Sequence, residues 1–225
     1  MKAGLFPMHV WLPEAHPAAP SHVSAIMSGV MIKTGVYGIM RVMWYIADST
    51  ELHTIGLIIL SVGIITGLWG VILAAVQNDA KRLLAYSSIE NVGVIFIGLG
   101  IATLGQASGN HLVATIALCG ALLHTVNHSL FKSLLFFGAG NIYSQMHTTL
   151  LDKFGGVAKH MPVTAILFFI ATLAICALPP LNGFVGEFLI YLGMLDSVRD
   201  NVNTIYAASG LLALALIGGI AVLAF

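Results

Sequence analysis

Long apolar runs separated by short polar stretches dominate this chain. Five of these runs reach the length of about 20 residues that a helix needs to cross a bilayer. They cover residues 21–46, 55–76, 83–102, 112–138 and 204–225. The pattern therefore predicts an all-α fold, a polytopic bundle of transmembrane helices.

A further apolar run, 163–196, is too long for one straight crossing. Pro179 and Pro180 interrupt it, and proline removes a helix hydrogen bond and clashes with the preceding turn. We expect a discontinuous helix with its break near 179–183. Residues 5–20 are also rich in proline and resemble the end of a second broken helix. Paired discontinuous helices are typical of an ion or substrate path in transporter folds.

The composition excludes several classes of protein. The chain is 58% hydrophobic and 8% charged, where soluble domains carry about 25% charged residues. Its formal net charge is zero, so it lacks the basic surface that nucleic-acid binding requires. Cys119 and Cys176 lie in apolar runs without a CxxC spacing, which argues against a disulfide framework or an iron–sulfur site. We expect residues 1–225 to form one transmembrane domain with no cofactor and no metal of its own.

Lysine and arginine are distributed unevenly among the loops. The loops at 77–82 and 141–161 contain Lys81, Arg82, Lys153 and Lys159. The loops at 47–54 and 103–111 contain neither residue type. By the positive-inside rule, the first pair of loops is predicted to be cytoplasmic. The expected location is the cytoplasmic (inner) membrane of a prokaryote.

Lys33 lies near the middle of the apolar run 21–46. A lysine near the centre of a bilayer costs about 2.5–3.5 kcal/mol on insertion scales. Long side chains can relieve that cost by reaching the interface, but Lys33 is too far from either end of its run. We therefore predict that Lys33 loads and releases a proton.

His124, His128 and Lys132 recur at a spacing of four residues within one apolar run. That spacing places them on one face of a helix, which must point towards protein or a hydrated cavity. Histidine can relay protons through either ring nitrogen. Structural hydrogen bonding and metal binding are the alternatives, although no carboxylate or cysteine stands at a ligand spacing.

The remaining ionisable residues fall into two groups. Glu90 lies inside an apolar run, and Glu187 directly follows the Pro-Pro break. A broken helix frees backbone groups and admits water, so Glu187 is placed to receive or discharge a proton, or to cap the second half-helix. His9, His16 and His22 flank the proline-rich start, and we expect them in loops or at the membrane interface.

Four motifs follow one another along the chain: KAGLFPMHVWLPEAHPAAPSHVSAIMSGVMIKTGVYG, DAKRLLAYSSIENVG, NHSLFKSLLFFGAGNIY and LPPLNGFVGEF. Together they resemble the antiporter-like subunits of respiratory complex I, Mrp-type cation/proton antiporters and membrane-bound hydrogenases. The segments SSIEN, NHSLFKSLLFFGAG and ALPPLNGFVGEF are most similar to the hydrogenase-4 and formate hydrogenlyase branch.

The resemblance implies a fold of two inverted repeats, each with a discontinuous helix, around a hydrophilic axis at the membrane midplane. This chain would correspond to the second half of that fold, as an N-terminally truncated part. By position, Lys2 matches the lysine of the first broken helix, and Lys33 the lysine of the next span. His128 and Lys132 match the connecting helix, and Glu187 the acidic residue of the second broken helix.

The function expected is that of a non-redox, proton-translocating subunit in a membrane-bound, hydrogenase-like respiratory complex. The predicted proton-transfer residues are Lys2, Lys33, Glu90, His124, His128, Lys132 and Glu187. The expected partners are other membrane subunits and soluble redox subunits, namely a NiFe hydrogenase large subunit and iron–sulfur proteins. The alternatives are an antiporter-like subunit of NADH-quinone oxidoreductase, an Mrp-type Na⁺/H⁺ antiporter subunit, and a structural scaffold without transport.

Overall fold

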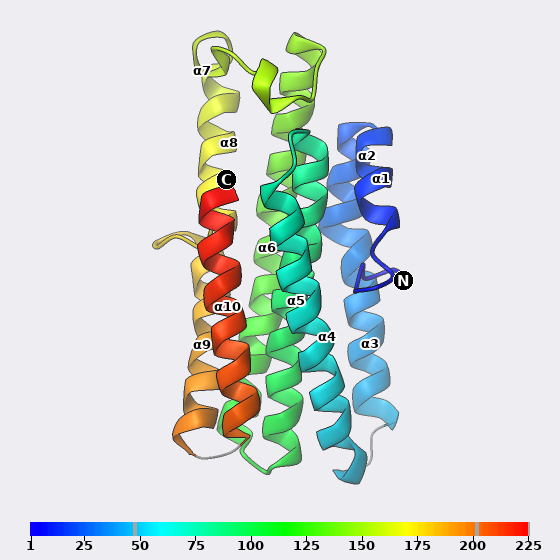
Figure 1. The fold of residues 1–225 in the computed structure, drawn as a ribbon, viewed down its shortest axis with the longest axis vertical. Coiled ribbons are helices and arrows are strands. Elements are labelled where there is room, and N and C mark those ends of the chain that lie inside the picture. Colours follow the sequence, from blue (N-terminus) through cyan, green and yellow to red (C-terminus); the bar gives the residue numbers. More distant parts are fainter. Residues whose placement is uncertain (47–48, 201–202, 225) are drawn as a thin grey trace.

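The computed structural model describes residues 1–46, 49–200 and 203–224, and in these ranges it is all-α, as predicted. Figure 1 shows the long helices packed side by side along one direction. The helices are α1 (Trp11–Ala18), α2 (Ser21–Ile26), α3 (Ile32–Ile46), α4 (Ser49–Ala75), α5 (Ala80–Ala107), α6 (His111–Met146), α7 (Val157–His160), α8 (Pro162–Ile175), α9 (Asn182–Arg199) and α10 (Thr204–Ala224). A π-helical segment, η1 (Met27–Met31), joins α2 to α3, and a 3-10 turn, η2 (Leu151–Lys153), precedes α7.

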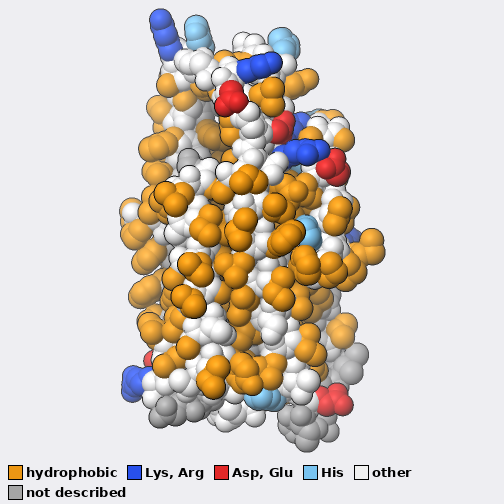
Figure 2. Space-filling model, viewed as in Figure 1, with side chains coloured by type: hydrophobic (Ala, Val, Ile, Leu, Met, Phe, Trp, Pro, Cys, Tyr) orange, Lys and Arg blue, Asp and Glu red, His pale blue; other side chains and the backbone are white. Residues whose placement is uncertain are grey.

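Several of these helices are long and apolar enough to cross a membrane. Within the described residues they are Ser21–Met43, Glu51–Ala75, Ala80–Ala107, His111–Met146 and Thr204–Ala224. On the face seen in Figure 2, hydrophobic side chains cover the middle of the molecule, and most charged side chains lie near its two ends. This distribution is that of a multi-pass integral membrane protein.

Helix α5 forms the centre of the bundle. Its apolar window is entirely buried, and it packs against α1, α4, α6, α9 and α10. Glycines allow the closest of these contacts, because a Cβ atom added at Gly93 would lie 2.3 Å from the backbone nitrogen of Gly67 on α4. Small residues at helix crossings are how membrane helices approach closely. The residues in the apolar window of α5 are therefore enclosed by the surrounding helices.

The apolar run 163–196 forms two helices, α8 and α9, separated by residues 176–181. In Figure 1 they lie end to end, and the connecting segment projects at mid-height of the bundle. A Cβ atom at Gly183 would lie 1.9 Å from the carbonyl oxygen of Ala174, so only glycine fits there. Asn127 on α6 donates its side-chain amide to the carbonyl oxygen of Asn182 at 2.7 Å. The discontinuous helix that belongs to the predicted fold class is thus present.

The start of the chain is less helical than the proline pattern suggested. Its one described helix before Ser21 is α1, and residues 1–10 form turns. Lys2 therefore lies in a turn and not on a helix. Figure 1 places this N-terminal segment beside α3, at mid-height of the bundle.

The two lysine- and arginine-bearing loops meet at one end of the molecule. The backbone nitrogen of Ala80 donates to Thr149 O at 2.9 Å, and that of Leu151 donates to Asn78 O at 2.9 Å. Asp79 caps α5 by accepting from the backbone nitrogen of Arg82 at 3.0 Å. Helix α6 continues to Met146, beyond the predicted boundary at 138, so its last turns extend past the apolar run into this polar end.

Candidate functional site

The side chains of His124, His128 and Lys132 lie along one face of α6, and we call them the α6 row. Their exposed fractions are 1%, 0% and 0%, respectively. Phe131 on the same helix contacts both imidazoles through its ring, with centroids 6.4 Å from His124 and 5.3 Å from His128. The spacing thus produces the single face that the sequence predicted, and that face is enclosed by protein.

Lys33 reaches the α6 row from the first span. Its ammonium nitrogen contacts Nδ1 of His128 and donates to the carbonyl oxygen of Ser28. The π-helical segment η1 immediately precedes α3, whose second residue is Lys33, and π segments are frequent at functional sites. Ser129 on α6 donates to the carbonyl oxygen of Gly29, also in η1, at 2.6 Å. The irregular backbone of η1 therefore supplies polar partners on both sides of the Lys33–His128 contact.

Helix α5 holds the other two members of the α6 row. Lys132 donates to the carbonyl oxygen of Leu84 at 2.9 Å and to the hydroxyl of Ser87. His124 Nε2 lies 3.0 Å from the side-chain oxygen of Asn91. Sequence reasoning did not assign Ser87 or Asn91 to the site. Both residues belong to the SSIEN motif, and polar residues inside an apolar run are the feature of the sequence that could have identified them.

Glu90 is also on α5 and is 3% exposed. Among the described residues its Oε2 atom has no hydrogen-bond partner. Lys132 and Glu187 both lie within electrostatic range of this carboxyl group. Helix α4 passes close by, because a Cβ atom at Gly70 would lie 2.5 Å from the backbone nitrogen of Glu90. Glu90 is thus enclosed between α4 and the α6 row.

Glu187 lies on α9, in the second turn after the break in the discontinuous helix. It lines a cavity of about 290 Å³. The other lining residues come from α9, from α10 and from the break itself, and they include Cys176, Phe184, Tyr191, Gly218 and Gly219. Gly218 and Gly219 have no atom within 4 Å of an added Cβ, so the α10 wall of the cavity is open. Glu187 is therefore half-buried, with room for small polar molecules beside it.

Lys2 is not brought into the α6 row. It is exposed, and it lines a shallow pocket with Ala3, Gly35 and Gly38 on the outer side of α3. Gly35 allows the chain to pass close to this helix, because its added Cβ would lie 2.6 Å from the nitrogen of Ala3. Lys2 and Lys33 thus belong to neighbouring segments but face different surroundings.

The prediction of loop or interfacial positions for the N-terminal histidines was wrong for His16, which lies in α1 and is 0% exposed. His9 lies in a turn, as predicted, although it is only 6% exposed, and His22 lies in α2 and is exposed. The His16 ring stacks on Phe136 of α6, with centroids 4.6 Å apart. Neither of its ring nitrogens has a hydrogen-bond partner in the described part of the chain. The His16 ring is buried because α1 packs against α5 and directs this side chain onto Phe136 of α6.

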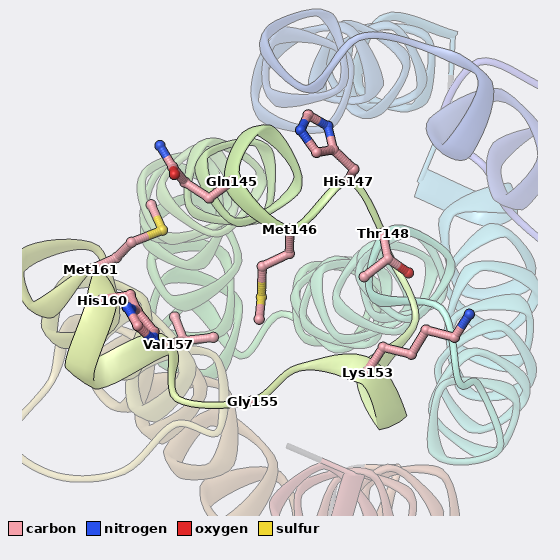
Figure 3. A pocket seen from close by; sticks show the side chains of 9 residues that line it. All are labelled: Gln145, Met146, His147, Thr148, Lys153, Gly155, Val157, His160 and Met161. Atoms are coloured by element: carbon pink, nitrogen blue, oxygen red, sulfur yellow. The ribbon is translucent and has the colours of Figure 1, made fainter.

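A second pocket, of about 670 Å³, lies away from the buried ionisable residues. Figure 3 shows its lining side chains, which come from the end of α6, the following loop and α7. They include His147, Lys153 and His160. No group of three or more potential metal ligands occurs in the described ranges, and this pocket contains none of the predicted proton-transfer residues.

The fold and the buried residues define a class: a multi-pass helical membrane protein with a discontinuous helix and a charged interior of the antiporter-like type. Residues 1–214 match the family described as NADH:quinone oxidoreductase/Mrp antiporter, transmembrane. The chain belongs to this family. The resemblance inferred from its motifs is therefore confirmed.

Curated relatives and solved structures agree with this assignment. Hydrogenase-4 component B of Escherichia coli K12 is 45% identical, over 100% of this chain and 34% of the relative. Formate hydrogenlyase subunit 3 of the same strain is 38% identical, over 98% of this chain and 36% of the relative. The chain thus spans about a third of the length of these relatives.

Two solved structures have the same fold. The archaeal membrane-bound sulfane sulfur reductase superposes with a TM-score of 0.81 at 24% identity, covering 98% of this chain and 42% of that chain. The Mrp complex from Dietzia sp. DQ12-45-1b superposes with a TM-score of 0.78 at 26% identity, covering 96% of this chain and 39% of that chain.

Proposed function

We propose that this chain carries protons within a membrane-bound respiratory complex of the hydrogenase type. One observation carries the proposal: the nitrogen of Lys33, a partly buried residue, contacts Nδ1 of the fully buried His128 between two transmembrane helices. A lysine in such a position is expensive unless it is paired and used. The contact joins Lys33 on one span to the α6 row on another.

The first transfer would run from lysine to histidine. The nitrogen of Lys33 contacts Nδ1 of His128, and with Lys33 protonated its ammonium would donate to the lone pair on that ring nitrogen. Moving the proton along this bond leaves a neutral amine and an imidazolium. The imidazolium then carries a second N–H at Nε2, an atom without a hydrogen-bond partner among the described residues. Release from Nε2 to a water molecule would pass the proton on and leave a neutral imidazole protonated at Nδ1, since either ring nitrogen can give up a proton.

Lys132 and the two carboxyl groups would respond to that charge. A positive charge on His128 repels the ammonium of Lys132, because both lie on one helix face in a low-dielectric interior. Glu90 lies within electrostatic range of Lys132 and Glu187. A proton displaced towards these carboxylates would keep the total charge of the cluster nearly constant. Glu187, beside its cavity, is the carboxyl group at which the proton would arrive or leave.

The partner complex and the membrane side are part of the proposal. The 45% identity to a hydrogenase-4 component over the whole chain supports a hydrogenase-type complex. Soluble redox subunits, with NiFe and iron–sulfur centres, would supply the electrons. The Lys81/Lys153 end would face the cytoplasm of a prokaryotic cell by the positive-inside rule.

A second candidate is cation/proton exchange of the Mrp type, without redox chemistry. The superposition on an Mrp complex favours it, with a TM-score of 0.78. The relative named NADH-quinone oxidoreductase subunit M of Rickettsia prowazekii, 34% identical, keeps a complex I role open as well. Each of the three roles would use the same ionisable residues of this chain, and the roles differ in the reaction or gradient that drives proton movement.

Proton uptake by sealed vesicles that contain the assembled complex tests the proposal. Lys33→Ala should lower uptake at least about tenfold, as loss of a proton-transfer group does. Lys159→Ala is the matched control, because this lysine is exposed in α7, and it should transport normally. Full uptake in Lys33→Ala, with normal assembly, would refute the proposal. Uptake that requires sodium and no electron donor would favour the Mrp-type role.

A further inference from the structure

We infer that Asn91 is a positioning residue that fixes the tautomer of His124, so that His124 binds and releases its proton at Nδ1. The inference rests on the proposed proton-transfer function. Asn91 and His124 are each 1% exposed and meet between α5 and α6. Neither residue is a surface group that water could reorient.

The orientation of the Asn91 amide follows from its neighbour. The Asn91 Nδ2 atom donates to the carbonyl oxygen of Ser87 at 2.8 Å. A carbonyl oxygen can only accept, so the amide nitrogen must face Ser87 and the amide oxygen must face away from it. That oxygen lies 3.0 Å from Nε2 of His124.

The orientation of the amide in turn decides which nitrogen of His124 carries hydrogen. An amide oxygen is an acceptor, so His124 Nε2 must be the donor. A neutral imidazole has one N–H, and Nδ1 of His124 therefore keeps the lone pair. In the described part of the chain Nδ1 is buried and has no hydrogen-bond partner. It is the open proton-accepting atom of this residue.

Helix α9 lies against this histidine. A Cβ atom added at Gly186 would lie 2.8 Å from the Cβ of His124, so no larger residue fits between the two helices. The backbone of Gly183, at the start of α9, lies within hydrogen-bonding reach of the His124 ring, so it would accept from Nδ1 once that nitrogen is protonated. Glu187 is the residue that follows Gly186. A proton bound at His124 would therefore be held beside the helix that carries Glu187.

The two histidines of the α6 row would then play different parts. Nδ1 of His128 contacts the Lys33 nitrogen, and Nε2 has no hydrogen-bond partner in the described part of the chain, so a proton could enter at one ring nitrogen and leave at the other. His124 keeps its Nε2–H bond to Asn91 in both charge states, so a proton must enter and leave at Nδ1. His128 is a relay, whereas His124 is a reversible store next to α9.

The ring-nitrogen signals of His124 test the inference directly. The whole complex is labelled with ¹⁵N-histidine, and the His124 signals are identified by their loss in His124→Gln. The expected wild-type state is protonated at Nε2 and unprotonated at Nδ1. Asn91→Asp keeps an oxygen acceptor facing His124, although it loses the donor to Ser87 and adds a negative charge, so Nε2 should remain protonated. Asn91→Leu removes the acceptor and should shift the signals towards the other tautomer.

Proton uptake by vesicles separates positioning from simple packing. Asn91→Leu should lower uptake at least about tenfold, while Asn91→Asp should retain more of it. Thr103→Val is the matched control, because Thr103 is 1% exposed on α5 and its hydroxyl, among the described residues, donates within its own helix to Leu99 O. A wild-type His124 protonated at Nδ1 would overturn the inference, as would unchanged signals and uptake in Asn91→Leu.

The two proposals fail separately. Normal uptake in Lys33→Ala would remove the proton-transfer function and leave the tautomer measurement standing. Loss of uptake in Lys33→Ala, together with an unchanged His124 tautomer in Asn91→Leu, would remove the role of Asn91 alone.

Discussion

At the scale of the residue, the side chains of Lys132 and Glu90 can carry opposite charges and interact electrostatically, but the hydrogen bonds of Lys132 go to other groups. The Lys132 ammonium has three hydrogens, and it donates to Leu84 O and to the Ser87 hydroxyl. The Glu90 carboxyl lies within electrostatic range, with Oε2 unpartnered among the described residues. A buried ion pair in direct contact would hold both charges in place. The separation seen here leaves Glu90 able to accept a proton.

Glu90→Gln tests this reading. Glutamine has the same size and hydrogen-bonding reach but cannot carry a proton as a carboxyl group does, so packing around α5 should persist. We expect proton uptake to fall at least about tenfold, with normal yield of the assembled complex. Glu14→Gln is the control, since Glu14 is exposed and its pair with Arg82 at 3.0 Å is a surface salt bridge. Equal uptake in the two variants would show that Glu90 is not a proton carrier.

The sequence predicted this site only in part. The spacing of His124, His128 and Lys132 predicted one helix face, because helical periodicity is a local property. The contact between Asn91 and His124 joins two helices, and no local spacing marks such a contact. His16 was misjudged because four prolines in its neighbourhood are typical of a loop, whereas packing of α1 on α5 buries the imidazole.

At the scale of the element, two irregular segments shape the site. The break at 176–181 was predictable, since Pro179 and Pro180 cannot continue a helix. The π-helical segment η1 was not, because it lies within one apolar run and only its backbone hydrogen bonds distinguish it from the α-helices on either side. It ends two residues before Lys33 and provides the carbonyl oxygen of Ser28 as a hydrogen-bond acceptor for that lysine. The part of the fold that matters most for Lys33 therefore depends on tertiary packing.

The α4–α5 crossing yields a prediction about stability. Gly93→Ala would place a Cβ atom 2.3 Å from the Gly67 nitrogen, so the two helices must separate. Overpacking of this kind costs about 1–3 kcal/mol. The temperature at which the purified protein loses its helical circular dichroism should fall by several degrees.

Gly38→Ala serves as the control for that experiment. Gly38 is exposed on α3 and has no atom within 4 Å of an added Cβ. Its stability should change by less than about 1 kcal/mol, in the favourable direction, because alanine is the better helix former. An equal loss in both variants would mean that the crossing is not as tight as described.

At the scale of the whole molecule, the ionisable interior links the two sides of the bundle. Lys33 comes from the first span, the α6 row from the centre, and Glu187 from the second half of the discontinuous helix. The apolar runs predicted the spans and their membrane character, because a helix that crosses a bilayer must consist mostly of apolar residues over its whole length. How the spans assemble around α5 depends on contacts between glycines and residues of neighbouring helices. A single sequence does not show which glycine meets which helix.

The most direct test of the central claim is proton uptake by energised vesicles that contain Lys33→Arg. Arginine keeps the positive charge and can still donate to His128, but it does not release a proton in proteins. If Lys33 hands its proton to His128, this variant should assemble normally and transport no faster than Lys33→Ala. Uptake close to the wild-type rate would contradict the account, because it would mean that Lys33 supplies only a fixed charge.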